Sequence, residues 1–161
     1  MYDTLFLDRD GVINKKLEGR YVTNFSEFAF IEGSVQAIIN LKSIFNKILI
    51  VTNQQGVGKK IMSVEDLHLI HSMMEDAISS DVKYIDKIYF CSHLDSDCCN
   101  CRKPDIGMLL QAKNDFPDLN VTNSFLVGDS ESDIQAGLKF GLKTIKVSDN
   151  YTLSNWTNSI I

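Results

Sequence analysis

The sequence predicts one α/β domain in which a parallel β-sheet is flanked by helices. Five short apolar runs alternate with stretches of helical periodicity, and such alternation produces right-handed crossovers between parallel strands. Each run is apolar on consecutive residues, as expected of strands that are covered on both faces. A chain of 161 residues supports one core of ordinary size. We therefore expect residues 1–161 to form a single domain.

The predicted strands are the apolar runs, which are rich in Ile, Val, Leu or Phe. They are residues 4–7, 47–52, 87–91, 124–127 and 143–147. The helical stretches between them are residues 33–45, 63–80, 106–116 and 131–140. The first carries one apolar stripe that ends at Phe45. The second begins with Ser63-Val64-Glu65-Asp66, which resembles a capping box with Asp in place of Glu. The fourth is followed by Gly141, a residue type that commonly terminates helices.

Polar side chains gather where three of the predicted strands end. Asp8 and Asp10 follow the first strand, Thr52-Asn53-Gln54-Gln55 closes the second, and Gly128-Asp129-Ser130 follows the fourth. Ligands of parallel sheets bind beyond the carboxyl ends of the strands, so the three clusters are expected to share one site. Acids, a hydroxyl and amides in that arrangement favour a site for phosphate and metal.

Asp8 and Asp10 are the most informative residues of this group. Alternate residues of a strand project from the same face, and Gly11 allows a sharp turn after them. Two close carboxylates raise each other's pKa unless a cation or a division of labour relieves the repulsion. The pair therefore indicates a metal site, a nucleophile with an acid/base partner, or both. A polar turn after a buried strand is the alternative for these residues taken alone.

The charge pattern argues against several classes of partner. The net charge is −5, and the basic residues are scattered along the chain. A nucleic-acid-binding or membrane-binding protein would present a cationic surface. No signal peptide or membrane-spanning stretch is recognisable, so we expect a cytoplasmic protein. Its thiols would stay reduced, which makes clustered cysteines metal ligands rather than disulfides.

Three thiols and an imidazole form such a cluster. Cys91-Ser92-His93 is followed by Cys99-Asn100-Cys101, which supplies the ligand set of a closed tetrahedral Zn²⁺ site. Cys98 complicates the choice, because Cys98-x-x-Cys101 is also a metal-binding spacing. The alternative is a set of reduced structural thiols beside a loop histidine.

Four motifs, taken in order, resemble those of the haloacid dehalogenase (HAD) superfamily. They are Asp8-Arg9-Asp10-Gly11-Val12-Ile13-Asn14, Val51-Thr52-Asn53-Gln54, Arg102-Lys103-Pro104, and Gly128-Asp129 followed by Asp133. The ordered set spans nearly the whole chain and is specific, although no single motif is. The resemblance implies a Mg²⁺-dependent phosphatase with a Rossmann-like, HAD-like core. The chain has no room for a large cap domain, so the site should be open.

The resemblance implies a role for each of these residues. Asp8 is the expected nucleophile, which forms an aspartyl-phosphate. Asp10 is expected to protonate the leaving oxygen and then to activate water. Mg²⁺ would be held by Asp8, Asp129 and the carbonyl of Asp10. Lys103 and the Thr52 hydroxyl would bind the transferring phosphoryl oxygens.

The remaining site residues are expected around the substrate. Asp133 is expected to orient its neighbours. The alternative is that its carboxylate lies in the first turn of a helix and only interacts favourably with the helix dipole. Short loops at residues 18–21, at residues 53–55 and around Arg102 would set specificity. The expected substrate-binding residues are Thr52, Asn53, Gln54, Gln55, Arg102, Lys103 and Ser130.

Within the superfamily, the cysteine-rich loop resembles the branch of D-glycero-manno-heptose 1,7-bisphosphate phosphatases and histidinol-phosphate phosphatases. In that branch the Cys-x-Cys pair directly precedes the Arg-Lys-Pro motif. This resemblance favours Cys99 over Cys98 and gives Cys91, His93, Cys99 and Cys101 as the zinc ligands. The zinc would fix an irregular loop and so position Arg102 and Lys103 over the site.

Two segments lean towards the heptose enzymes. Residues 21–33 and 104–110 are similar to segments of that family, although Ile106 stands where a second proline is usual. The resemblance implies an enzyme that binds Mg²⁺ and Zn²⁺ and removes the C7 phosphate from a small phosphorylated sugar. We also expect a monomer and, from the charge pattern, no nucleic-acid or membrane partner. Histidinol phosphate is the alternative substrate, because the short spacing from His93 to Cys99 occurs in that branch too. A non-enzymatic, zinc-stabilised binding module is a second alternative, against which the complete set of acids argues.

Three side chains remain without an expected role in the chemistry. His68 and His71 lie one helical turn apart and are expected on the helix surface, because no third metal ligand is near. Trp156 is expected to be packed rather than functional.

Overall fold

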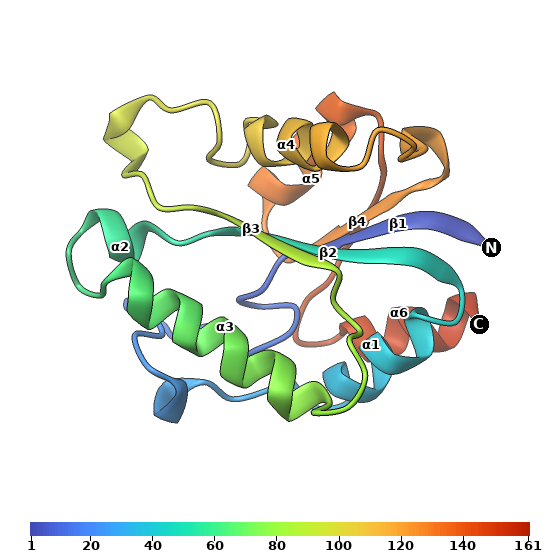
Figure 1. The fold of residues 1–161 in the computed structure, drawn as a ribbon, viewed down its shortest axis with the longest axis horizontal. Coiled ribbons are helices and arrows are strands. Elements are labelled where there is room, and N and C mark those ends of the chain that lie inside the picture. Colours follow the sequence, from blue (N-terminus) through green and yellow to red (C-terminus); the bar gives the residue numbers. More distant parts are fainter.

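Figure 1 shows the computed structural model, which describes residues 1–161 and contains one five-stranded parallel sheet in the order β3-β2-β1-β4-β5. The strands are β1 (Tyr2–Leu7), β2 (Phe45–Asn53), β3 (Lys87–Cys91), β4 (Phe125–Gly128) and β5 (Lys143–Lys146). The predicted fold class is confirmed, and each predicted strand coincides with an observed one to within two residues at either end. Because all five strands are parallel, their carboxyl ends meet at one edge.

Helices cover both faces of the sheet (Figure 1). One face carries α1 (Ser34–Leu41), α3 (Val64–Ile78) and α6 (Leu153–Ile160), and the other carries α4 (Gly107–Asp115) and α5 (Glu131–Phe140). Successive side chains of a strand point to opposite faces, so each strand contributes to both cores. In β1, Leu5 and Leu7 pack under α1 and α3, whereas Phe6 packs under α4 and α5. The short pieces are α2 (Gln55–Gly58) and the 3₁₀ turns Phe25–Glu27, Asp95–Asp97 and Val121–Asn123.

Local sequence sets the ends of the helices near the site. Ser63 and Asp66 exchange side-chain-to-backbone hydrogen bonds, which confirms the capping box at the start of α3. Ser130 and Asp133 form the same arrangement at α5, so this helix begins directly after β4. Gly141 ends α5 with a φ of 95°, the left-handed conformation expected of a terminating glycine.

One expectation about an element was wrong, and one helix was missed. The first helix ends at Leu41, and Phe45 instead begins β2, because a buried strand follows the helix directly and continues its apolar pattern. The helix α6 was not expected at all. It begins with a capping box formed by Thr152 and Asn155, and it buries Trp156 against the sheet as expected of a packed residue. None of the helices has the length and apolar character needed to cross a membrane.

Candidate active site and metal centres

The carboxyl edge of the sheet encloses a cavity of about 260 Å³. Segments that follow β1, β2 and β4 meet there with the segment that precedes α4. Of the predicted residues, those that line the cavity are Asp8, Asp10, Asn53, Gln54, Gln55, Arg102, Lys103, Ser130 and Asp133. Thr52 lies beneath them with a fully buried side chain, and Asp129 lines a neighbouring hollow beside Gly11.

The loop after β1 brings Asp8 close to Asp129. The N–H of Asp8 donates to the Val127 carbonyl at 3.0 Å, which continues the pairing of β1 with β4. Gly11 then turns the chain with a φ of +89°, which L side chains rarely adopt. A Cβ atom at this position would lie 2.3 Å from Asp129 Oδ2, so only glycine lets the loop approach that carboxylate.

Lys103 is the buried cation of the site. Its ammonium group donates to Asp8 Oδ1 at 2.9 Å and to the Val51 carbonyl at 2.7 Å, and it lies 2.6 Å from Asp133 Oδ1. These contacts use all three of its protons. Its backbone exchanges two hydrogen bonds with the Asn53 side chain, at 3.0 and 3.1 Å, so the end of β2 holds the lysine in place.

Burial sets the protonation of this group of residues. It would lower the pKa of Lys103, but the charges of Asp8 and Asp133 outweigh it and raise that pKa. Burial raises the pKa of Asp8 to about 7, although the Lys103 charge acts in the opposite direction. Lys103 and the bonds from Ser130 outweigh burial at Asp133 and lower its pKa, but Lys103 does not offset the burial of Asp8, so Asp8 favours a further cation.

Asp10 is held by three donors. Its Oδ1 accepts from Arg9 Nη2 at 3.0 Å and from Asn14 Nδ2 at 2.9 Å, and its Oδ2 accepts from Gln54 Nε2 at 2.7 Å. Burial alone would raise the pKa of Asp10, but the Arg9 charge and these hydrogen bonds outweigh it and lower the pKa. Asp10 is therefore a carboxylate in the free protein, and the negative charge of an arriving phosphate would favour its protonation.

The carboxylates of Asp8, Asp129 and Asp133 lie within 4.8 Å of one another. Asp129 Oδ1 is buried without a hydrogen-bond partner, as expected of an oxygen that receives a cation. Asp133 already uses both oxygens, because Oδ1 contacts Lys103 and Oδ2 accepts from the N–H and the hydroxyl of Ser130. The oxygen donors available to a cation are those of Asp8 and Asp129, and such hard ligands suit Mg²⁺.

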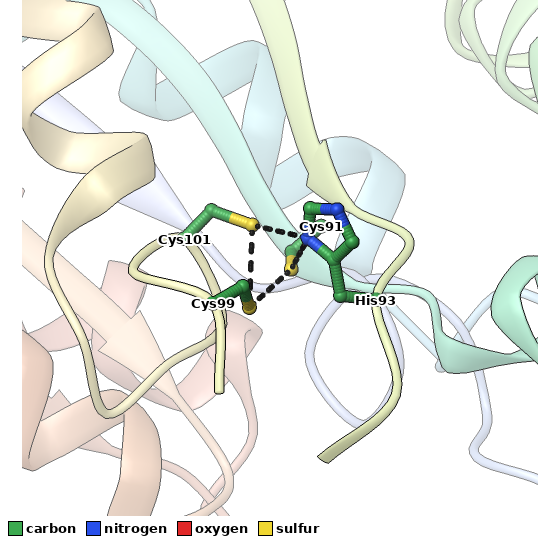
Figure 2. A group of neighbouring side chains, drawn as sticks. All are labelled: Cys91, His93, Cys99 and Cys101. Atoms are coloured by element: carbon green, nitrogen blue, oxygen red, sulfur yellow. Dashed lines mark hydrogen bonds between the residues drawn. The ribbon is translucent and has the colours of Figure 1, made fainter. Parts of the chain in front are cut away.

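A second group of metal-ligand residues lies at the end of β3 (Figure 2). Its members are Cys91, His93, Cys99 and Cys101, whose ligand atoms are separated by 3.6 Å in three contacts and by 3.1 Å in the fourth. Zinc bonds of about 2.3 Å to sulfur in a tetrahedron place ligand atoms about 3.7 Å apart, so these four fit Zn²⁺. Cys98 is exposed and contacts the Ser96 carbonyl instead.

Hydrogen bonds tie this cysteine-rich loop to the cavity. Gln55 donates to the Tyr21 hydroxyl at 2.9 Å and accepts from the N–H of Asp95 at 2.8 Å. Asp95 in turn accepts from Arg102 Nε at 3.3 Å. Arg102 Nη1 is buried and has no partner in the protein, so this arginine retains an unused donor.

Known proteins share this architecture. Residues 100–159 match the family described as HAD-hydrolase-like. The chain is 42% identical over 131 residues to a D-glycero-α-D-manno-heptose-1,7-bisphosphate 7-phosphatase of Mycobacterium tuberculosis, an alignment that covers 81% of this chain and 69% of that protein. It is 41% identical over 142 residues to the protein of the same name from Campylobacter jejuni, with 88% and 79% covered. The chain belongs to the haloacid dehalogenase superfamily.

A solved structure of a HAD relative supports the same assignment. The D,D-heptose 1,7-bisphosphate phosphatase of B. bronchiseptica, complexed with magnesium and phosphate, superposes with a TM-score of 0.84 at 29% identity and covers 98% of this chain and 86% of that one. The chain is therefore a phosphoric monoester hydrolase of the HAD superfamily. The magnesium of that relative agrees with the oxygen donors that Asp8 and Asp129 present here.

Sequence reasoning missed two features of the HAD site. Lys16 lines the cavity outside the predicted loop 18–21, of which Arg20 and Tyr21 also line it, and the signal for Lys16 was the pair of lysines directly after the first motif. His71 is only 5% exposed and lies 3.1 Å from Arg9, so the expectation of a surface histidine was wrong. His71 falls on the helical stripe of Leu67 and Met74, which indicates a buried face, whereas His68 is exposed as expected.

Proposed function

We propose that this HAD phosphatase removes the C7 phosphate of a D-glycero-manno-heptose 1,7-bisphosphate through an aspartyl-phosphate intermediate. The relatives named for that reaction support the substrate, because they match over most of the chain. The observation that carries the chemistry is the position of Asp8, a buried carboxylate that contacts Lys103 through Oδ1 only. Oδ2 is left to act as the nucleophile.

The two carboxylates have different roles in this two-step reaction. Asp8 attacks phosphorus, so that a bond from Oδ2 to phosphorus forms while the bond from phosphorus to the C7 oxygen breaks. Asp10 gives its proton to that departing oxygen. In the second step Asp10 takes a proton from water, the water oxygen attacks phosphorus, and phosphate leaves as Asp8 is regenerated.

Positive charge is needed in the site to offset the repulsion between Asp8 and the phosphate. A carboxylate oxygen and a phosphate oxygen at about 3 Å repel by roughly 5 kcal/mol at an effective dielectric constant near 20. Mg²⁺ held by Asp8, Asp129 and the Asp10 carbonyl would neutralise this charge when bound. Lys103 supplies the cation of the protein itself, and Thr52 retains its hydroxyl proton because its Oγ1 accepts from Gln54 at 2.8 Å. The Thr52 hydroxyl would bind a phosphoryl oxygen, and Lys103 would do so by exchanging one of its present contacts for it.

We also propose that the four-residue cluster at the end of β3 holds Zn²⁺. Its ligand separations support this assignment, as does its composition of three thiols and one imidazole. A closed structural site of this kind would keep Arg102 and Lys103 in place, because Cys101 directly precedes them.

The second phosphate of the substrate would meet a cationic mouth of the cavity formed by Lys16, Arg20 and Arg102. Arg102 offers an unpartnered Nη1, and a guanidinium binds a phosphate through two parallel hydrogen bonds. Histidinol phosphate carries a cationic amine at the corresponding end, which these three side chains would repel. The mouth therefore supports a bisphosphate.

The test compares kcat/KM for both anomers of the heptose bisphosphate, histidinol phosphate and p-nitrophenyl phosphate at matched pH and Mg²⁺. We expect the bisphosphate to be preferred. Arg102→Ala should lower its kcat/KM by about 10- to 100-fold, the range of a lost charge-assisted contact, with little change for the aryl phosphate. Lys83→Ala, which removes an exposed cation outside the cavity, is the control. A preference for histidinol phosphate, or an equal loss on both ester types, would overturn the substrate assignment.

A further inference from the structure

A buried arginine and a buried histidine lie behind Asp10 and take no part in the chemistry described so far. Arg9 is fully buried, and its Nη2 donates to Asp10 Oδ1 at 3.0 Å. Its Nη1 lies 3.1 Å from His71 Nε2, and its Cζ lies 5.9 Å from the centre of the Phe28 ring. The guanidinium is thus held between a carboxylate, an imidazole and an aromatic ring.

The direction of the contact between Arg9 and His71 follows from their chemistry. A guanidinium has donors only, so His71 Nε2 accepts and its proton sits on Nδ1. Burial, and then the neighbouring Arg9 charge, lower the pKa of His71 to about 3. The imidazole is therefore neutral near pH 7 and suited to accept a hydrogen bond from a cation.

The row of α3 that carries His71 is otherwise apolar. Leu67 and Met74 are fully buried on the same stripe, and both belong to the core beneath the sheet. A polar side chain in such a row costs stability unless it is hydrogen-bonded. The structure records the contact with Arg9 as its only hydrogen bond, so this contact accounts for a histidine at position 71.

The two oxygens of Asp10 are in different situations because of Arg9. Oδ1 accepts two donors, from Arg9 and Asn14, which leaves it no place for a proton. Oδ2 accepts one donor, from Gln54, which lines the cavity. When Asp10 is protonated, the proton must reside on Oδ2.

We propose that His71 is a positioning residue for acid catalysis, which holds Arg9 so that Arg9 keeps the proton-carrying oxygen of Asp10 turned towards the leaving group. The proposal rests on the function proposed above, in which Asp10 is the acid of the first step. Without His71, the guanidinium loses one of its two hydrogen-bonded side chains, so its contact with Asp10 Oδ1 is less firmly fixed. When that contact opens, Asp10 Oδ1 keeps only its Asn14 donor, as Oδ2 keeps only Gln54, and either oxygen could carry the proton.

The leaving group distinguishes this role from a purely structural one. A sugar alcohol leaves only with a proton, whereas p-nitrophenolate leaves without one, so only the sugar ester depends on acid catalysis. The parameter to compare is kcat/KM, because it covers the steps up to departure of the leaving group. Three variants at position 71 are assayed on both esters, with melting temperatures recorded for each.

We expect His71→Leu to lower kcat/KM by about tenfold more for the heptose bisphosphate than for p-nitrophenyl phosphate. His71→Asn should do the same, because its shorter amide does not reach Arg9, and it serves in place of the leucine variant if that chain does not fold. His71→Gln should retain both activities, since its side-chain oxygen reaches the position of Nε2. His68→Leu, one turn earlier on the exposed face of α3, is the matched control and should change neither.

Equal losses on the two esters, no loss in the asparagine variant, or failure of glutamine to restore the sugar activity would each overturn the role of His71. If the wild-type protein turns over neither ester, the proposed function is overturned instead, so the two failures are distinguishable.

Discussion

At the scale of single residues, the site works because its acids have different partners. Asp8 gives one oxygen to Lys103, Asp10 has both oxygens bonded, and Asp129 has a buried oxygen with none. A nucleophile needs a free oxygen, an acid/base needs a defined one, and a metal ligand needs an unpartnered one. The three hydrogen-bonding states match the three roles proposed for these acids.

Replacement of Asp8 by Asn tests the nucleophile. The amide is nearly isosteric and can still accept from Lys103, so the fold should survive, but it cannot attack phosphorus. We expect kcat to fall by about 10⁴-fold or more while the melting temperature stays near the wild-type value. Phosphate should bind more tightly, because one repelling charge is gone. Steady-state kinetics and calorimetric titration measure both effects, and turnover within about tenfold of wild type would remove Asp8 from this role.

Lys103 is expected to stabilise the fold as well as the reaction. Lys103→Met removes the partner of two buried carboxylates, and loss of one member of such a buried group costs about 3–5 kcal/mol. For a chain of this size we expect the melting temperature to fall by about 10 °C, along with loss of turnover.

The control for that variant is Lys87→Met. Lys87 pairs with Asp115 at 2.7 Å, but both side chains are substantially exposed, at 46% and 33%. Water and salt screen such a pair, so the melting temperature should change little. Similar shifts in the two lysine variants would show that burial of Lys103 does not carry the effect.

The positions of the charged site residues could be predicted from the sequence, but not all of their hydrogen bonds. Asp8, Asp10 and Asp129 follow apolar runs, and parallel strands bring such positions to one edge. The contact between Arg9 and His71 joins residues 62 positions apart, and no periodicity pairs them. Only the packing of α3 against the loop after β1 creates it.

At the scale of elements, the cysteine-rich loop is the least regular part of the site and yet carries two of its cations. The segment from β3 to α4 contains one 3₁₀ turn, and hydrogen bonds from Gln55 and Arg102 join it to the cavity. A chain without a regular ladder needs another constraint to hold such a position, and we propose that zinc bound at the four-ligand cluster would supply it.

Single cysteine changes test this constraint. Cys99→Ser should lose zinc, because it removes one of four converging ligands, and Cys98→Ser should retain about one Zn²⁺ per chain, because its sulfur points elsewhere. The zinc-free variant should also lose more kcat/KM on the bisphosphate than on p-nitrophenyl phosphate, since Arg102 is no longer held. Elemental analysis of the purified proteins gives the stoichiometry, and zinc loss in Cys98→Ser with retention in Cys99→Ser would reverse the ligand assignment.

The elements themselves were predictable to differing degrees. The strands that are buried on both faces stood out as continuous apolar runs, and α5 was placed correctly at both ends. Phe45 was assigned to a helix because an apolar stripe does not mark where a helix gives way to a buried strand. The capping signal of α6, Thr152 with Asn155, was present but used Asn where Glu is more common.

At the scale of the whole molecule, one sheet connects two cores. Ile48 and Ile50 of β2 pack on the face of α1, α3 and α6, whereas Leu49 and Val51 pack on the face of α4 and α5. Every central strand contributes alternate side chains to the two cores in this way. Neither core can therefore open without disturbing the strands that support the other. We infer that the chain is a single cooperative domain, with the site at an edge to which both cores contribute.

Trp156→Ala tests this cooperativity far from the site. Trp156 lies on α6 and packs against Phe45 and Phe125, with ring centroids 6.3 and 5.8 Å apart. Its loss should cost about 3–5 kcal/mol, as for other large aromatic residues in cores. In calorimetry of the zinc-loaded protein we expect one transition with an enthalpy of about 110 kcal/mol near 60 °C, and the variant should move that transition down as a whole. If instead the variant resolves into two transitions, with only one displaced, the face of α4 and α5 folds independently of α6 and the chain is not one cooperative domain.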